Sequence, residues 1–195
     1  MRFKRRTLLQ AVAALPIAST AARAENDAAW AALRSGNHLA LMRHALAPGS
    51  YDPPGFRLAD CSTQRNLSAE GRAQAVRIGG LFRSNGIASA AVFSSQWCRC
   101  LETGRLMALG EVKEQPLLNA YIGQRPAALY VEDPAQAAAL CSWISQMDLA
   151  RPPVLVTHDV VVSLLTKNRV SSGEIVVLRR EPDGNLTVAR RVSTD

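Results

Sequence analysis

Short apolar runs alternate with helix-like stretches along most of this 195-residue chain, and this alternation limits its fold more than any other feature. Three of the runs, 38–43, 90–93 and 153–157, are four to six residues long, which is typical of strands buried on both faces. One of the stretches between them has a helix start signal in Ser68 and a stop signal in Asn85-Gly86. Strands alternating with helices predict a three-layer α/β/α sandwich with a mainly parallel central sheet.

The same signals give approximate bounds for each element. The expected helices cover 26–35, 69–84, 97–109, 134–147 and 160–166, and the expected strands cover 38–43, 90–93, a short segment near Val112, 153–157, 174–179 and 186–190. The last two strands are joined by Pro182-Asp183-Gly184-Asn185, which predicts a hairpin turn. The segment 45–66, rich in Pro, Gly and polar residues, is expected to be a loop, and loops of this length in compact domains are usually functional.

The first 24 residues have the order of an export signal. A basic start leads into the apolar run 8–17 and then into Ala22-Arg23-Ala24, which predicts cleavage after Ala24. The pair Arg5-Arg6 resembles a twin-arginine signal, and an ordinary signal with two additional arginines is the alternative. We therefore expect a signal peptide over 1–24, one domain over 25–195, and a bacterial protein that is periplasmic or secreted. The apolar run is too short to span a bilayer, so no stable membrane insertion is expected after the signal is removed.

Net charge argues against a nucleic-acid partner. The chain carries +7, but the predicted signal holds five of the 23 Lys and Arg residues and none of the 16 acids, so the remainder carries +2. That remainder has no long basic run and no basic stripe interleaved with aromatic residues. A protein that binds nucleic acid is therefore not expected.

The four cysteines, Cys61, Cys98, Cys100 and Cys141, all follow the predicted signal. An even number of cysteines in an exported chain permits two disulfides, and buried free thiols are the alternative. Cys61 lies in the loop 45–66, where we expect it to meet either Cys98 or Cys100. The chain offers no second closely spaced cysteine pair and no suitably placed histidine, so no zinc site is expected.

Reactive side chains stand at the ends of three predicted strands. Arg43-His44 ends the first strand, Arg99 follows the second, and His158-Asp159 follows the third. The carboxyl ends of parallel strands meet at one edge of a sheet, which is where ligands bind. A nitrogen nucleophile beside fixed positive charge suits phosphoryl transfer, because that charge stabilises the three equatorial oxygens of the moving group. Arginine supplies such charge through a planar fork that matches phosphate.

These segments resemble the signature of the histidine phosphatase superfamily, also called phosphoglycerate mutase-like. The resemblance covers about residues 38–180 and rests on Leu41-Met42-Arg43-His44, on Phe93-Ser94-Ser95 with Arg99 and Thr103, on Val156-Thr157-His158, and on the segment 65–75. It implies that His44 is the phosphorylated nucleophile and that Arg43, Arg99 and His158 complete the phosphate pocket. The arginines supply the charge that a metal would otherwise supply, so we expect no metal and no other cofactor. Arg65 is expected either to bind phosphate or substrate from the loop or to be solvated.

The sequence differs from the superfamily pattern at two positions. Ala45 stands where a glycine commonly follows the first histidine, which is a small change. Asn119 stands where the mutase-like branch has the glutamate that protonates the leaving alcohol. Asp159 is the alternative acid, because His158-Asp159 resembles the acid phosphatase and phytase branch, in which that aspartate is the proton donor. The ordinary role for Asp159 would be to cap the N-terminus of the helix 160–166.

Several neighbouring side chains have two interpretations. Glu102, one helical turn from Arg99, would either orient that guanidinium or form an ordinary surface pair. Tyr51, Phe56 and Arg57 would either line the substrate entrance or pack as a lid.

Together these observations predict an exported phosphomonoester hydrolase that acts on a small phosphorylated substrate through a phosphohistidine intermediate. The chain also resembles small exported members of the superfamily associated with phosphorylated cell-envelope sugars, such as lipopolysaccharide core heptose phosphatases. One alternative is a non-catalytic binder of phosphorylated ligands, which Asn119 favours. The other is a mutase or phosphotransferase, whose soluble phosphorylated metabolites would be cytosolic.

Overall fold

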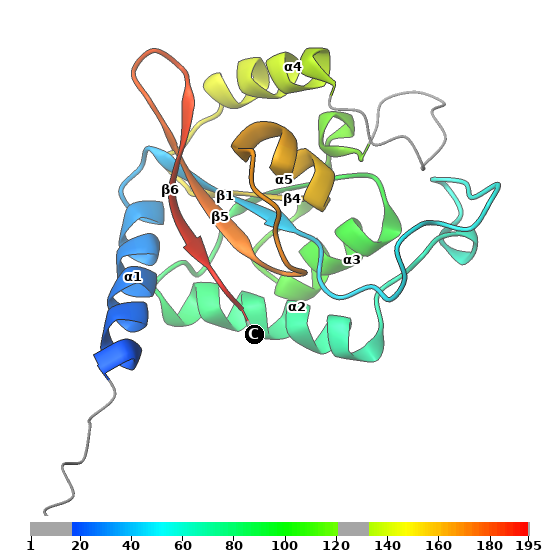
Figure 1. Ribbon diagram of the computed structural model, residues 1–195, viewed down its shortest axis with the longest axis horizontal. Coiled ribbons are helices and arrows are strands. Elements are labelled where there is room, and N and C mark those ends of the chain that lie inside the picture. Colours follow the sequence, from blue (N-terminus) through cyan, green and yellow to red (C-terminus); the bar gives the residue numbers. More distant parts are fainter. Residues whose placement is uncertain (1–16, 121–132, 195) are drawn as a thin grey trace, which may run out of the picture.

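The computed structural model describes residues 17–120 and 133–194 and contains a six-stranded sheet between two layers of helices (Figure 1). The sheet has the order β3-β2-β4-β1-β5-β6, built from β1 (His38–Arg43), β2 (Ala91–Ser94), β3 (Val112–Glu114), β4 (Pro153–Thr157), β5 (Ile175–Arg180) and β6 (Leu186–Val192). The strands β3, β2, β4 and β1 run parallel to one another. Strand β5 pairs antiparallel with β1, and β6 pairs antiparallel with β5. The predicted α/β/α sandwich with a mainly parallel sheet is confirmed.

Helices cover both faces of the sheet. The described helices are α1 (Ile17–Leu33), α2 (Ala69–Ser84), α3 (Cys98–Met107), α4 (Pro134–Ser145) and α5 (Asp159–Thr166), with short 3-10 turns η1 (Cys61–Thr63) and η2 (Pro116–Leu118). In the view of Figure 1, α4 and α5 lie above the strands, and α1, α2 and α3 lie below them. Two apolar clusters fill the spaces between these layers and the sheet.

Burial on both faces explains why the central strand β1 is apolar at nearly every position. Leu39 and Leu41 of β1 point into the cluster under α4 and α5, whereas Ala40 and Met42 point into the cluster under α1, α2 and α3. All four side chains are fully buried. A strand buried on both faces has no polar side, so its pattern is a continuous apolar run rather than an alternation.

The first helix is longer than the sequence predicts. It begins at Ile17 rather than at Asn26, so the predicted cleavage point after Ala24 lies within it. The alanine-rich sequence before Asn26 favours helix, which explains the longer element. Its C-terminal half packs on the sheet through Trp30 and Leu33, and the ring of Trp30 meets that of Phe82 edge-on, with 5.0 Å between centroids. The signal peptide over 1–24 stays a prediction.

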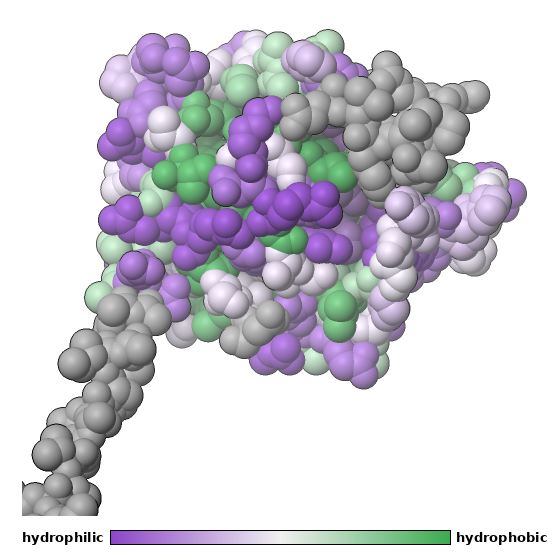
Figure 2. Space-filling view, in the orientation of Figure 1, coloured by the Kyte–Doolittle hydropathy of each residue, from purple (hydrophilic) through white to green (hydrophobic). Residues whose placement is uncertain are grey.

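Arginine and glutamate pairs cover the antiparallel end of the sheet. Figure 2 shows a band of hydrophilic residues across the middle of this face, over β5 and β6. Arg179 pairs with Glu181 at 2.6 Å, and Arg191 pairs with Glu174 at 2.5 Å. Among the helices within 17–120 and 133–194, none is long and apolar enough to cross a membrane.

One disulfide joins Cys61 of η1 to Cys98 at the start of α3, with 5.6 Å between the Cα atoms. This is one of the two pairings expected for Cys61. A second bridge does not form, because the buried Cys100 lies on α3 below the sheet, whereas Cys141 lies on α4 above it. The two remaining thiols are therefore free.

The disulfide predicts a thiol count and a stability difference. Protein denatured without reductant should show two free thiols rather than four. Cys61→Ser should lower the free energy of unfolding in urea by about 3 kcal/mol, because the bond closes a loop of 37 residues in the unfolded chain. Cys141→Ser is the matched control and should change stability much less, since its half-buried thiol has no covalent partner. Four reactive thiols would contradict the bridge.

Candidate active site

Strand register brings the two histidines together. Arg43 of β1 stands opposite Thr157 of β4 in the parallel ladder, so His44 and His158 leave the sheet at the same edge. The backbone N–H of His44 donates to the carbonyl of Thr157 at 2.9 Å, which extends the ladder by one bond. The two imidazole rings meet edge-to-face, with 5.6 Å between centroids and 72° between planes. The site therefore lies at the carboxyl ends of the parallel strands, as predicted.

A pocket of about 340 Å³ opens at this edge. Its lining includes all six residues that the sequence predicts for the site, namely Arg43, His44, Arg65, Arg99, His158 and Asp159. Tyr51 and Arg169 line it as well. The structure thus brings the predicted residues together from β1, the loop 45–66, α3 and the β4–α5 junction.

His44 has the protonation pattern of a nitrogen nucleophile. Its Nδ1 lies 2.8 Å from the carbonyl oxygen of Ala45, and because that oxygen only accepts, Nδ1 carries the proton. Nε2 therefore keeps its lone pair. Burial lowers the pKa of His44 well below its usual value, and Arg99 lowers it further, with smaller contributions from Arg65 and Arg43. The imidazole is consequently neutral at pH 7.

The backbone after His44 is held from two helices. The N–H of Ala45 donates to Oγ1 of Thr103 on α3 at 3.0 Å, and the N–H of Leu46 donates to Oε1 of Gln74 on α2 at 2.9 Å. The first turn of α2 packs so closely that a Cβ at Gly71 would stand 1.9 Å from the carbonyl oxygen of Leu46. Ala45 itself is fully buried. These contacts fix the direction in which the chain leaves the nucleophile.

His158 is held by a chain of hydrogen bonds. Its Nε2 lies 2.9 Å from Oγ of Ser95, and that hydroxyl lies 3.1 Å from Oδ1 of Asn119. Since Oδ1 only accepts, the hydroxyl donates to Asn119 and accepts the proton of Nε2. Nδ1 is then the acceptor that faces Nη2 of Arg99, at 3.4 Å. Burial, followed by Arg99 and His44, lowers the pKa of His158 well below its usual value.

Asn119 supports the site from behind and does not line the pocket. Its Oδ1 also accepts from the backbone N–H of Gln96 at 2.9 Å, and its Nδ2 donates to Oε1 of Gln96 at 3.0 Å. Every polar atom of this buried amide therefore has a partner. The residue that replaces the usual glutamate holds Ser95, and through it His158.

Guanidinium groups in the pocket wall give the pocket its positive charge. Nη1 of Arg99 donates to Oδ1 of Asp52 at 2.8 Å, and Nη1 of Arg43 donates to the carbonyl of Val170 at 3.1 Å. The Nε atoms of Arg43 and Arg99 are shielded from water and have no hydrogen-bond partner among the described residues. An unsatisfied buried donor costs about 1–3 kcal/mol, so an anion that accepts from these groups would be stabilised here.

Asp159 is a buried residue of the pocket lining and contacts the segment after α5. Its Oδ1 accepts from the backbone N–H of Val170 at 2.9 Å, and its Oδ2 pairs with Arg169 at 2.5 Å. The helix α5 begins at Asp159, and His158 occupies the N-cap position. The alternative role of Asp159 as a helix N-cap is therefore wrong, because its carboxylate binds the following loop rather than the first turn of α5.

Arg99 is oriented by a residue that the sequence analysis did not single out. Glu102, the sequence-based candidate, pairs with Arg72 of α2 at 2.6 Å, which is the surface-pair alternative. The partner of Arg99 is Asp52, 47 residues earlier in the chain. In the sequence, Asp52 begins the segment Asp52-Pro53-Pro54-Gly55, whose composition is typical of a turn. No local signal therefore identifies Asp52 as the partner of Arg99.

The remaining loop candidates have separate roles. Tyr51 lines the pocket, with 58% of its surface exposed. Phe56 packs on Trp97, with 5.7 Å between ring centroids. Arg57 pairs with Asp60 at 2.5 Å on the surface and does not line the pocket. Of these three candidates, only Tyr51 is in place to meet a substrate.

Other reactive groups are less suited to chemistry at this edge. Cys100 lies 3.6 Å from Nε2 of His158, but burial raises the pKa of its thiol to about 12, so a thiolate nucleophile is not available. Within 17–120 and 133–194, no group of three or more His, Cys, Asp or Glu side chains is arranged to hold a metal ion.

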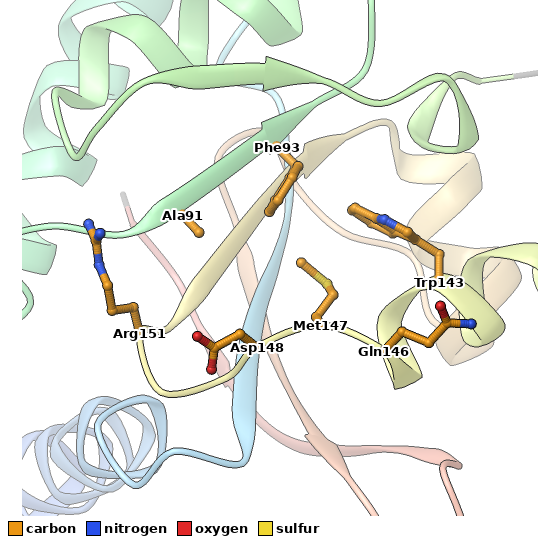
Figure 3. Close-up of a pocket in the computed structure, with 7 residues that line it drawn as sticks. All are labelled: Ala91, Phe93, Trp143, Gln146, Met147, Asp148 and Arg151. Atoms are coloured by element: carbon orange, nitrogen blue, oxygen red, sulfur yellow. The ribbon is translucent and has the colours of Figure 1, made fainter.

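A second cavity, of about 460 Å³, lies beside β2 and the C-terminal end of α4 (Figure 3). Phe93 and Trp143 form part of its wall, with their rings edge-to-face and 5.1 Å between centroids. Figure 3 shows Asp148 and Arg151 toward the end nearer Ala91, away from Trp143. This cavity contains none of the residues predicted for the site.

No protein-family model matches the sequence, and no curated protein sequence matches it. Solved structures do match the fold. The protein histidine phosphatase SixA complexed with tungstate is 16% identical, with a TM-score of 0.54 over 80% of this chain and 97% of the other. YhfR of Bacillus stearothermophilus is 18% identical, with a TM-score of 0.60 over 80% and 98%.

A phosphoserine phosphatase variant from Entamoeba histolytica, in complex with phosphoserine, is 14% identical, with a TM-score of 0.54 over 81% of this chain and 98% of the other. Each of these structures is covered almost completely by the match. At these identities the likeness establishes the architecture. The chain has the fold of these solved structures, an α/β/α sandwich of the phosphoglycerate mutase-like type.

Proposed function

We propose that this chain is an exported phosphomonoester hydrolase in which His44 carries the phosphoryl group between substrate and water. One observation carries the proposal: a buried, neutral imidazole with its proton fixed on Nδ1 shares a pocket with Arg43, Arg65 and Arg99. A free Nε2 lone pair supplies the nucleophile, and the guanidinium groups supply charge where the transferred group gains it.

The reaction has two steps, phosphorylation of His44 and hydrolysis of the phosphohistidine. Nε2 of His44 bonds to phosphorus as the bond to the leaving oxygen breaks, and that oxygen takes a proton from the carboxyl of Asp159. Water then attacks the phosphohistidine, returns a proton to Asp159 and releases inorganic phosphate. Arg43, Arg65 and Arg99 hold the equatorial oxygens. A bound phosphate dianion favours protonation of His158, which turns that ring into an additional donor.

The proposed substrates are small phosphorylated molecules of the cell envelope, with phosphorylated sugars as the first class to examine. Export motivates this choice, and the Cys61–Cys98 disulfide supports export because such bonds persist in oxidising compartments. Phosphohistidine peptides and phosphoserine are the comparison substrates, since matching folds belong to proteins described by those ligands or activities.

A non-catalytic binder of phosphorylated ligands is the second candidate. The observation that favours it is that both oxygens of Asp159 already have partners, in Val170 and Arg169. Arg169 has 82% of its side chain exposed, however, and an exposed ion pair contributes little free energy. The carboxyl can therefore leave this pair at low cost when a substrate arrives.

Hydrolysis of 4-nitrophenyl phosphate tests the proposal, because its leaving group needs little protonation. The purified protein should release nitrophenolate, and exhaustive chelation should leave the rate unchanged since arginines provide the positive charge. Tungstate or vanadate should inhibit competitively by occupying the same pocket. An activity lost on chelation and restored by one divalent ion would show a metal-dependent reaction, and tungstate binding without turnover would support the binder.

A further inference from the structure

Asp52 makes buried hydrogen bonds to two residues that line the pocket, Arg65 of the loop 45–66 and Arg99 of α3. Its side chain is 7% exposed, and its Oδ1 accepts from Nη1 of Arg99 at 2.8 Å and from the backbone N–H of Arg65 at 2.9 Å. Its Oδ2 accepts from Nε1 of Trp97 at 3.0 Å. A carboxylate with three N–H donors is well compensated for its burial. This carboxylate is therefore fixed in one orientation.

These contacts determine which edge of Arg99 remains for a ligand. Nη1 is engaged by Asp52 and, at 3.3 Å, by the carbonyl of Arg65. Nη2 has only the 3.4 Å contact with Nδ1 of His158, and Nε has no partner among the described residues. Asp52 thus holds one corner of the guanidinium and leaves the Nε and Nη2 edge, the fork that matches two phosphate oxygens.

Asp52 also fixes the ring on which this arginine rests. The guanidinium carbon of Arg99 lies 5.9 Å from the ring centroid of Trp97, and the same ring meets His158 edge-to-face at 5.2 Å. By accepting from Nε1, Asp52 sets the orientation of that indole. Asp52 therefore constrains the guanidinium of Arg99 in two ways, directly through the hydrogen bond to Nη1 and indirectly through the ring of Trp97.

The loop that carries Asp52 is itself tied to the start of α3. Oε1 of Gln64 accepts from the backbone N–H of Cys98 at 3.0 Å, and Cys61 is bonded to Cys98. Arg99 is the next residue in α3. The loop and the arginine consequently share one anchor, which keeps Asp52 in register with the group that it contacts.

We propose that Asp52 is a positioning residue that acts through Arg99, presenting the Nε and Nη2 edge of this guanidinium to the oxygens of the transferred phosphoryl group. This inference rests on the proposed function and deepens it. Asp52 does not line the pocket, so it would act through Arg99 rather than by contact with the substrate. Its negative charge offsets part of the positive charge of the pocket, so its removal alone would favour anions. A loss of anion affinity would therefore report lost geometry.

A double-mutant cycle on Asp52→Ala and Arg99→Ala tests the proposal, with tungstate dissociation constants from calorimetry and kcat/KM for 4-nitrophenyl phosphate. Asp52→Ala should weaken tungstate binding at least ~10-fold and lower kcat/KM by ~10²-fold, the scale of one lost oxyanion donor. In the Arg99→Ala background, the same change should alter either quantity by less than about 3-fold, because groups that act as a unit are not additive.

Two further variants show whether a loss of binding or activity comes from a displaced Arg99 or from unfolding of the protein. Asp52→Asn keeps an acceptor for Nη1 and should recover part of the loss. Asp60→Asn is the matched control in the same loop, since Asp60 pairs with the exposed Arg57 away from the pocket, and it should leave both quantities unchanged. Thermal unfolding of each variant identifies any loss of folded protein.

The outcomes distinguish this inference from the proposed function. Equal losses from Asp52→Ala in both backgrounds would overturn the inference and make Asp52 an anchor of the loop only. Unchanged tungstate affinity in folded Asp52→Ala would overturn it as well. The unsubstituted protein could bind tungstate and hydrolyse no phosphomonoester, while the double-mutant cycle on tungstate binding shows the expected coupling between Asp52 and Arg99. In that case the positioning role stands and the proposed hydrolase activity fails.

Discussion

Replacing His44 with alanine is expected to lower turnover of 4-nitrophenyl phosphate by at least ~10⁴-fold, because no other side chain in the pocket offers a free nitrogen lone pair in the same position. The fold should remain intact, since His44 joins the sheet through backbone atoms: its N–H donates to Thr157, and its carbonyl accepts from Gly173. Tungstate should still bind, because Arg43, Arg65 and Arg99 remain. The variant should therefore keep the phosphate pocket and lose the reaction.

Rapid quenching with labelled substrate measures the intermediate directly. The unsubstituted protein should trap label that is released by acid and retained in base, as expected of a phosphoramidate, and His44→Ala should trap none. His38→Ala is the matched control. It removes a histidine from the opposite end of the same strand, where Nδ1 contacts the hydroxyl of Ser35 at 3.0 Å, and activity should be kept. Label on any residue other than His44 would contradict the mechanism.

Substitution of Asp159 with asparagine is expected to separate substrates by leaving group. A sugar alkoxide needs a proton as it departs and a nitrophenolate hardly does, so Asp159→Asn should slow hydrolysis of sugar phosphates by ~10²-fold or more and spare nitrophenyl phosphate to within a small factor. The amide oxygen can still accept from the N–H of Val170, so the contact that holds the loop after α5 should persist. Paired kcat/KM values for the two substrates give the measurement.

Asp148→Asn provides the control for this experiment. Asp148 also accepts a backbone N–H through Oδ1, from Ala150 at 2.9 Å, but it lies at the second cavity, away from His44. Equal losses on both substrates in Asp159→Asn would show that Asp159 holds the pocket wall through Val170 and Arg169 rather than donating a proton. The donor would then have to be sought elsewhere, either in the loop 45–66 or around Glu132-Asp133. Asp133 caps α4, and Glu132 lies outside the described residues.

The architecture was predictable from the sequence, and so were the residues that the structure brings together at the candidate site. Buried parallel strands require continuous apolar runs, and segments such as 38–43 and 153–157 show them without reference to any neighbour. The reactive residues follow those runs directly, so Arg43-His44 and His158-Asp159 could be assigned to one sheet edge before any contact was known. The N-cap Ser68 is equally local, and its hydroxyl accepts from the N–H of Gly71 as expected.

The residues that support the site from distant parts of the chain could be identified only from the packing of separate elements. Asp52 meets Arg99 across 47 residues of sequence, and Cys61 pairs with Cys98 rather than Cys100 because α3 turns only one of the two toward η1. Glu102 has the spacing of an i,i+3 partner for Arg99, yet packing of α2 on α3 gives it Arg72 instead. Local spacing constrains residues within one element, whereas the partners of a buried charge depend on how separate elements pack, and that information is absent from any short stretch of sequence.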